Sequence, residues 1–393
     1  MWCSSRCCCC GPTGCSVRRW CPVSEPRRRR LPGRGQALTV GLLVVAVATP
    51  FYVGPFWLQV GLTAMAYAVA AIGLAIQVGV AGQLSLAHAV FMGSGAYLYS
   101  FLGGASTGQV TGLGWPPWLA ALGAIVLTAL LGALCSPISA RLRGLYLGVA
   151  SLGLVFIASH VMQRFGALTG GPGGREVPPL RLGPLDFSDD TTWVIANVPF
   201  HQAEKLWMLG LAVLAGAYLV ARRMVAGRGG LALHMMRDSE IGAAAMGITV
   251  WRYKASAFVI AAVYGATGGV LLALLTGWVV PESFGFDASV NLLIMVVIGG
   301  LGSIRGAIPG AVFVSALPLL IARQAQSIPL ISGTGDSILG PGTLSTFLYA
   351  GLFIVTIMFA SGGLDRLVAL AVGTRRPQRR IAGGLPGKYA QEG

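Results

Sequence analysis

The sequence predicts an all-α membrane protein, a polytopic bundle of about nine transmembrane helices plus a half-span or broken helix. Of its 393 residues, 55% are hydrophobic and only 10% are charged. Apolar runs of about twenty residues recur along the chain, and this is the length that an α-helix needs to cross a bilayer. The 57 glycines suit the close helix approach that stabilises bundles in lipid, where apolar side chains gain nothing by clustering.

Ten apolar segments define the expected elements. In chain order they lie at residues 37–54, 60–79, 84–104, 117–138, 144–163, 206–221, 255–277, 290–299, 306–322 and 344–361. All but one are long enough, or nearly so, to cross a bilayer. The exception, "VNLLIMVVIG" at 290–299, rises only ~15 Å as a helix, so we expect a half-span or part of a broken helix there.

Both ends of the chain are basic. Residues 1–36 hold eight Arg and one Glu (8 − 1 = +7), and residues 364–393 hold six Lys or Arg and two acidic residues (6 − 2 = +4). The positive-inside bias therefore predicts that both termini are cytoplasmic. Alternate crossings of a membrane domain at 37–363 then place an outer loop at 164–205 and a charged segment at 222–254 inside.

The two basic tails carry no recognisable site. Seven of the eight cysteines lie in residues 1–21, but "CCCC" lacks the paired spacing of zinc ligands. We interpret residues 1–36 as a disordered Cys-rich tail or a mis-assigned start. A signal peptide is an alternative, since "AVA" at 46–48 resembles a cleavage site. Without an aromatic-interleaved basic patch, we expect no nucleic-acid partner.

The sequence offers no catalytic grouping. The four histidines are scattered, and neither a G-x-S-x-G elbow nor a phosphate-binding G-x-x-x-x-G-K-[ST] loop is present. We therefore expect a protein that is not an enzyme, with no metal or cofactor of its own. Ionisable residues are nearly absent from the expected spans, which weighs against an ion-coupled transporter.

The segment "GRGGLALHMMRDSEIGAAAMGITVWRYK" at 227–254 holds six charged residues. Placing them mid-bilayer would cost about 2.5 to 3.5 kcal/mol each, so the segment must lie in water. Its part "LALHMMRDSEIGAAAMG" reads as a short helix with a small-residue surface beside a charged one. Such a surface suits docking into a partner's groove, although an ordinary solvated loop is the alternative.

Several motifs recur in one order. They are "GQLSLAHAVFMGSGAY" at 82–97, "LRGLYLGVASLGL" at 142–154, "LTGGPGG" at 168–174, the segment at 227–254 and "MVVIGGLGSIRGAIPGA" at 295–311. Together they resemble the LivM-type permeases of branched-chain amino acid importers of the ATP-binding cassette class. The likeness covers roughly residues 40–365 and leaves out both tails. The wording "LHMMRDSE" departs from the family's usual form, which leaves the details of docking open.

The resemblance implies a function and a set of partners. The chain would translocate branched-chain or related amino acids across a bacterial inner membrane, with urea or short amides as alternative substrates. It would pair with a homologous permease subunit, two cytoplasmic ATP-binding subunits that use ATP, and an extracytoplasmic solute-binding protein. A stand-alone secondary transporter is the alternative of a different class. The positions implied to couple to the ATPase are Arg237, Asp238, Glu240, Ala243, Ala244 and Gly247.

A polar stripe and a glycine cluster are candidates for the substrate path. Helical spacing would place Ser85, His88, Met92, Gly95 and Tyr99 on one face, with Gln83 at its entrance. These side chains could line the path or bond to neighbouring helices. The glycines of "IGGLGSIRGAIPG" could break a helix whose dipole faces a carboxylate, or could serve close packing. The path candidates are Gln83, Ser85, His88, Asn291, Gly299, Gly300 and Gly302.

"LTGGPGGREVPP" opens the outer loop at 164–205. Its glycines and prolines predict a stretch without regular elements. The resemblance places this loop on the side where a solute-binding protein delivers substrate, whereas a simple connector is the alternative.

Overall fold

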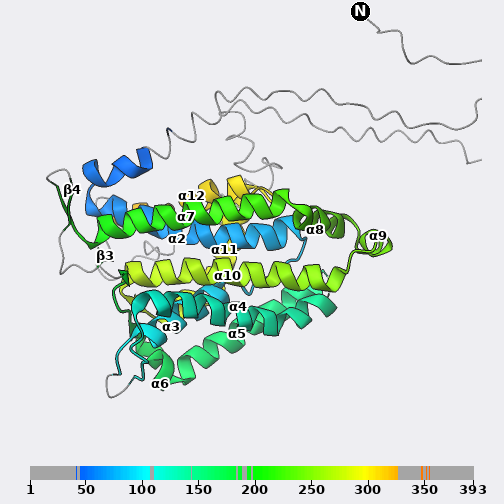
Figure 1. The fold of residues 1–393 in the computed structure, drawn as a ribbon, viewed down its shortest axis with the longest axis horizontal. Helices are drawn as coiled ribbons and strands as arrows, with labels where there is room; N and C mark the ends of the chain where they lie inside the picture. The colour runs from blue at the N-terminus through cyan, green and yellow to red at the C-terminus, as the bar shows by residue number, and fades with distance from the viewer. Residues whose placement is uncertain are drawn as a thin grey trace, which may run out of the picture.

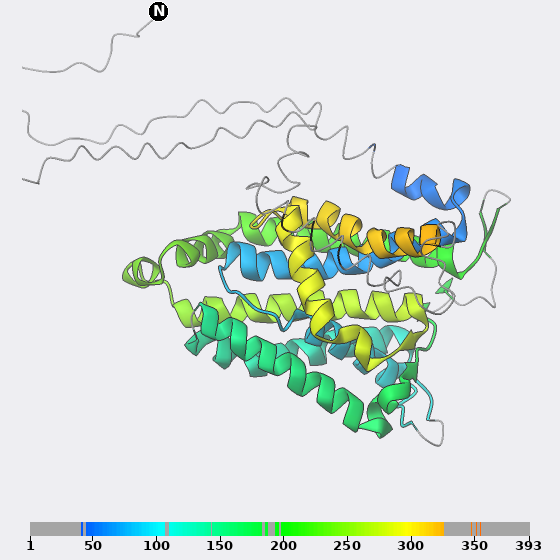
Figure 2. The ribbon, with the colours of Figure 1, turned by 180° about the vertical axis from the view of Figure 1, so that it is seen from behind.

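The protein is a bundle of long helices in a computed structural model (Figure 1). The structure describes residues 41, 45–106, 110–142, 144–182, 185–187, 193–195, 198–325, 347, 351 and 354. The long helices run side by side along one direction, so the bundle has two ends (Figures 1 and 2). We call them the α8–α9 end (residues 228–245) and the hairpin end, where the short strands lie.

Helices make up most of the described chain, which confirms the expected mostly helical fold. They are α2 (Pro55–Leu74), the π-helix η1 (Ala75–Val80), α3 (His88–Gly103), α4 (Pro117–Arg141), α5 (Leu145–Arg164), α7 (Gln202–Ala226), α8 (Arg228–Asp238), α9 (Glu240–Ala245), α10 (Val250–Thr276), α11 (Phe286–Gly299) and α12 (Ile304–Ala325). Among the residues that the structure describes, five candidate spans are long and apolar enough to cross a membrane, namely α2 with η1, α4, α5, α7 and α10. The chain is therefore a multi-pass membrane protein.

Five of the expected spans coincide with these helices, at 60–79, 117–138, 144–163, 206–221 and 255–277. Residues 37–40 and 42–44 of the first expected span and most of the span at 344–361 lie outside the described residues, as do the tails at 1–36 and 364–393. The count of nine spans and the cytoplasmic termini therefore stay predictions. The expected short helix at 290–299 is α11, with 14 residues. It is followed at once by α12, and in Figure 2 α11 (yellow) crosses the long helices whereas α12 (orange) runs along them.

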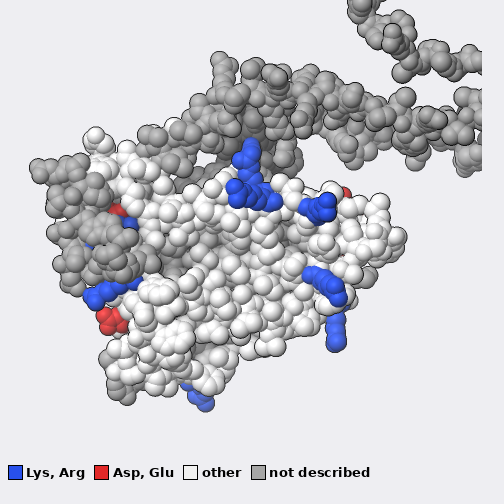
Figure 3. Space-filling model, in the orientation of Figure 1, with Lys and Arg blue, Asp and Glu red and all other residues white. Residues whose placement is uncertain are grey.

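The core of the bundle is built around α2 and α10. The share of the apolar window that is buried is 83% in α2 with η1 and 67% in α10, but only 28% in α4 and in α5 and 11% in α7. Small residues let the two central helices meet, since a Cβ added at Gly268 would lie 2.7 Å from the carbonyl oxygen of Ala66. The peripheral helices leave a broad uncharged surface, with charged side chains towards its margins (Figure 3).

The outer loop is more regular than its glycines and prolines predict. It contains α6 (Gly166–Thr169), the 3-10 helix η2 (Gly171–Gly173), and the strands β1 (Arg175–Glu176), β2 (Arg181–Leu182), β3 (Leu185–Asp186), β4 (Trp193–Ile195) and β5 (Val198–Phe200). The expectation of no regular element was wrong. Gly170 at φ 79° and Gly174 at φ 77° let the chain turn tightly between α6, η2 and β1. β1 then pairs antiparallel with β6 (Trp278–Val279), which follows α10.

The expected helix at 84–104 begins later than predicted, at His88. Gly82 takes φ 71°, and the Gln83 amide bonds back to the Gln77 carbonyl at 3.0 Å, so the chain turns before α3 starts. Ser85 lies in this connection and its hydroxyl accepts from the Ala87 amide at 3.3 Å. The placement of Ser85 on the helical face of His88 was therefore wrong.

Candidate functional site

The segment at 231–247, predicted as one short helix, forms two. The break falls at Ser239, which takes φ −159° and caps α9 by accepting a 3.0 Å hydrogen bond from the Gly242 amide. Gly247, at φ 83°, follows the end of α9. In Figure 1, α9 lies at the tip of this end, beyond the ends of the long helices.

The six expected coupling positions do not share one surface. Asp238, Ala244 and Gly247 are exposed, whereas Ala243 is 2% exposed and packs beneath α9 in a cluster with Val80 and Leu233. Because Ala243 faces its own protein, it supports the helix from inside. The large exposed side chains here are two that were not among the six coupling positions: Ile241 is 80% exposed, and Met246, which follows α9, is 69% exposed.

Of the three charged coupling residues, Glu240 and Arg237 each make a contact back to the protein, although Arg237 as a whole remains exposed, as does Asp238. Glu240 Oε1 lies 2.6 Å from Nζ of Lys254, a buried residue in the first turns of α10. Arg237 Nη1 donates a hydrogen bond to the carbonyl oxygen of Gly79, near the end of η1. These contacts tie α8 and α9 to the bundle beneath them.

Three buried polar side chains surround the connection between η1 and α3. Gln83 donates from Nε2 to the Lys254 carbonyl at 3.2 Å, while its Oε1 is buried and has no partner in the described chain. His88 is 1% exposed and packs between α2 and α10, because a Cβ at Gly73 would lie 3.3 Å from its Cε1 and one at Gly265 would lie 3.5 Å from its Nε2. Gln77, in η1, is fully buried and neither amide atom has a partner among the described residues.

Gln77 was missed by the sequence analysis. It stands in an apolar run, and the hydropathy of that run predicts only a span. A lone glutamine amid apolar residues was nevertheless a usable signal, because polar groups in a membrane helix are costly and tend to be functional. With Gln83 and His88, two buried polar side chains that follow within eleven residues of the chain, it makes up what we call the polar cluster.

The remaining face of α3 is devoted to packing. A Cβ at Gly95 would lie 2.6 Å from Cα of Ala266, so this glycine lets α3 and α10 touch. Met92 is buried in the main apolar cluster. The hydroxyl of Tyr99 donates to the Pro178 carbonyl at 3.0 Å, at the hairpin end. These three residues follow the interhelical alternative rather than a solute path.

The glycine cluster forms the turn between α11 and α12. A Cβ at Gly310 would lie 2.9 Å from the Gly299 amide nitrogen, so these glycines pack the two helices closely. Gly300 and Gly302 take φ 110° and 90°, values that L side chains rarely adopt. Asn291 is half-buried eight residues before Gly299, about 12 Å further along α11. The path candidates on α11 are thus spread over its length.

Arg175 holds together two loops at the hairpin end. Its Nη1 donates to the carbonyls of Thr111 at 2.7 Å and Leu168 at 3.0 Å, and its guanidinium lies 5.8 Å from the ring centre of Phe101. Burial lowers the pKa of the Arg175 guanidinium, since desolvation disfavours its charged form. The residue ties the α3–α4 connection to the outer loop.

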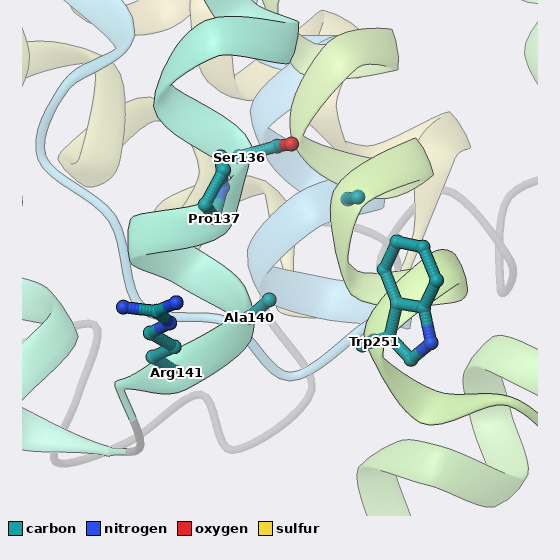
Figure 4. A pocket seen from close by; sticks show the side chains of 6 residues that line it. Ser136, Pro137, Ala140, Arg141 and Trp251 are labelled. Carbon is teal, nitrogen blue, oxygen red and sulfur yellow. The ribbon is translucent and has the colours of Figure 1, made fainter.

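A cleft of about 300 Å³ opens between the end of α4 and the start of α10. Ser136, Pro137, Ala140 and Arg141 line one side, and Trp251 and Ala255 line the other (Figure 4). None of the substrate-path candidates predicted from the sequence lines this cleft.

The comparisons with known proteins decide the family. Residues 56–357 match the model of a family described as the permease component of branched-chain amino acid transport systems. This chain belongs to that family. The permease is 31% identical to the high-affinity branched-chain amino acid transport system permease protein LivM of Salmonella typhimurium over 296 residues, which are 72% of this chain and 67% of the relative. The LivM protein of Escherichia coli matches with the same values.

The permease is also similar to LivH of Escherichia coli, another high-affinity branched-chain amino acid transport system permease protein. The two are 26% identical over 312 residues, 76% of this chain and 91% of LivH. No solved structure matches. The family match includes both the α8–α9 end and the polar cluster, so this region of the permease belongs to the family's shared part.

Proposed function

We propose that this permease is the membrane-spanning subunit of an ATP-binding cassette importer that moves branched-chain or related amino acids across the bacterial inner membrane. It would act with a homologous permease subunit, two cytoplasmic ATP-binding subunits and an extracytoplasmic solute-binding protein. The family match and the similarity to LivM and LivH support the substrate class and the pairing of two permeases. Under this proposal the permease binds no cofactor, and the ATP is used by its partners.

The exposed face of α9 is the observation that carries the coupling part of the proposal. Ile241 and Met246 present large apolar side chains there, with Ala244 and Gly247 exposed beside them. The cost of burying the charges of segment 222–254 in lipid favours water around this end. Apolar side chains that face water, on a helix with small neighbours, suit the groove of a protein partner.

The orientation follows from the same argument. With the α8–α9 end in the cytoplasm, the hairpin end faces the opposite side, where a binding protein would deliver the solute. The β1–β6 pairing and the Arg175 contacts give that side a defined surface. ATP-driven closure of the two ATPases would move α8 and α9, and the bundle would alternate between outward and inward access.

For the solute path we propose the polar cluster of Gln77, Gln83 and His88. Unpaired buried amide and imidazole atoms are rare in folded proteins and call for a partner such as a water or a ligand. The zwitterionic head of an amino acid needs such partners when it leaves water. The cluster lies between the two central helices and the α8–α9 end, so movement of that end would reach it.

The test is uptake by proteoliposomes that contain the complete complex. We expect accumulation of radiolabelled leucine that requires ATP and the binding protein. Excess valine or isoleucine should compete, whereas urea and acetamide should not. Uptake without any ATPase subunit would support a stand-alone transporter and overturn the proposal, and competition by urea or acetamide alone would reassign the substrate.

The docking face has its own test. Ile241→Glu should weaken co-purification of the ATP-binding subunits and lower uptake, because a charge would enter an apolar contact. Leu113→Glu is the matched control, since Leu113 is also an exposed apolar residue but belongs to the α3–α4 connection at the hairpin end. Equal co-purification of wild type and Ile241→Glu would remove α9 as the docking helix.

A further inference from the structure

The side chain of Arg237 lies where three elements meet. Arg237 is the penultimate residue of α8, and its Nη1 donates to the Gly79 carbonyl in η1. A Cβ at Gly82 would lie 2.9 Å from Cγ of Arg237, and a Cβ at Gly302 would lie 3.2 Å from its Nη1. The Arg237 side chain therefore packs against Gly82, just after η1, and against Gly302 in the α11–α12 turn.

The Gly79 carbonyl is available because η1 ends there. The last amide bonds of this segment run from Ala81 to the Ile76 carbonyl and from Gln83 to the Gln77 carbonyl, both at 3.0 Å. Carbonyls in the last turn of a helix lack intrahelical partners and carry the negative end of the helix dipole. The cationic guanidinium therefore caps the continuous helix formed by α2 and η1.

The same point touches the α11–α12 turn. A Cβ at Gly79 would lie 2.5 Å from the Gly302 amide nitrogen and 2.7 Å from its Cα, so the two backbones are in direct contact. One short turn of π-helix and one turn with two glycines at positive φ meet here. Neither has the regular α-helical hydrogen-bond ladder, and such segments are where helices bend.

We propose that Arg237 is a positioning residue for transport, which transmits movement of α8 to the end of η1 and to the α11–α12 turn, rather than a contact for the ATPase. The proposal rests on the proposed function and adds the route by which the docking helices act on the bundle. The guanidinium contacts two elements that belong to different parts of the chain, and neither is held by a regular α-helical hydrogen-bond ladder. Gln77 lies two residues before Gly79 in the same π-helical turn, so a movement of η1 would displace this member of the polar cluster.

The test measures the ATP hydrolysed per molecule of leucine accumulated by the complete complex in proteoliposomes. Arg237→Met keeps much of the aliphatic stem but removes the charge and the donor. We expect it to assemble with the ATP-binding subunits and hydrolyse ATP, while the ATP consumed per leucine rises about tenfold, the effect of losing one charge-assisted hydrogen bond. Arg237→Lys should recover part of the coupling, because it restores a cation near the Gly79 carbonyl.

Arg228→Met is the matched control, since Arg228 is the exposed first residue of the same helix. It should leave the ratio unchanged. Two results would overturn the proposal: an unchanged ratio in Arg237→Met, or loss of ATPase co-purification in parallel with uptake, which would make Arg237 a docking residue. If Arg237→Met does not reach the membrane, Arg237→Lys decides, and a wild-type ratio in that variant counts against the proposal. Absence of ATP-dependent uptake in the wild type would instead refute the proposed function.

Discussion

Nζ of Lys254 lies 2.6 Å from Oε1 of Glu240, which joins the first residue of α9 to the beginning of α10. The lysine is buried, and its backbone carbonyl also accepts the hydrogen bond from Gln83. The pair therefore connects α9, the central helix α10 and the connection leading into α3. A buried cation needs such a partner, since an unpaired one is costly.

Exchanging the charges of this pair tests its contribution. Lys254→Glu or Glu240→Lys alone brings like charges together and should lower the free energy of unfolding by about 1–3 kcal/mol. The double variant should recover most of the loss. Recovery should be incomplete, because the new lysine would stand at the N-terminus of α9, where the helix dipole favours an acidic residue.

The measurement is thermal unfolding of the purified permease in detergent, read for the wild type and all three variants. Losses that simply add in the double variant would show that the two side chains do not interact. In that case the pair could not be what holds α9 against α10.

Close backbone contact between Gly79 and Gly302 leads to a second prediction. Gly79→Ala should destabilise the protein by about 1–3 kcal/mol, because the added methyl group would press on the Gly302 backbone, which cannot move aside as a flexible side chain can. Gly153→Ala is the control, since nothing lies within 4 Å of a Cβ at that position in α5. It should leave the melting temperature unchanged or raise it slightly, because alanine favours the helix. Equal melting of Gly79→Ala and the wild type would contradict the contact.

The hairpin end depends on Arg175. Arg175→Met should leave the Thr111 and Leu168 carbonyls without their donor, at a cost of about 1–3 kcal/mol. We expect faster proteolysis of the connection between α3 and α4 and a lower melting temperature. Arg164→Met, at the exposed end of α5, is the control. Equal proteolysis in the two variants would mean that Arg175 does not fasten the loops.

The long spans were predictable because a chain segment in lipid can satisfy its backbone hydrogen bonds in few ways. A run of about twenty apolar residues must become a helix to satisfy its backbone, whatever its neighbours are. The short α11 followed from its length, and the exposed position of α8 and α9 followed from the cost of their charges. These expectations needed only local composition.

The contacts that define the site could not be predicted in this way. Arg237 and the Gly79 carbonyl are 158 residues apart in sequence, and no local pattern pairs them. The π-helix at 75–80 has an ordinary apolar composition, so its geometry reflects packing against α10 and α8 rather than propensity. In the outer loop, β1 likewise forms because it finds its partner β6 about a hundred residues later, whereas β2 pairs with β3 and β4 with β5 within the loop itself.

Replacing Gln77 should change stability and transport in opposite directions. Both of its amide atoms are buried without a partner in the described chain, so the folded state bears their desolvation cost. Gln77→Leu removes that cost at nearly constant volume and should raise the free energy of unfolding by about 1–3 kcal/mol. If the amide serves the solute path, the same variant should lower leucine uptake several-fold, the exchange of stability for function that is common at working sites.

Gln59→Leu is the control for this experiment, because Gln59 is exposed on the same helix, α2. It should change neither the melting temperature nor uptake by much. A Gln77→Leu permease that is more stable and transports at the wild-type rate would remove Gln77 from the path. A less stable variant would show instead that the amide has a partner, such as a buried water, and that its role is to hold η1 in its π-helical form.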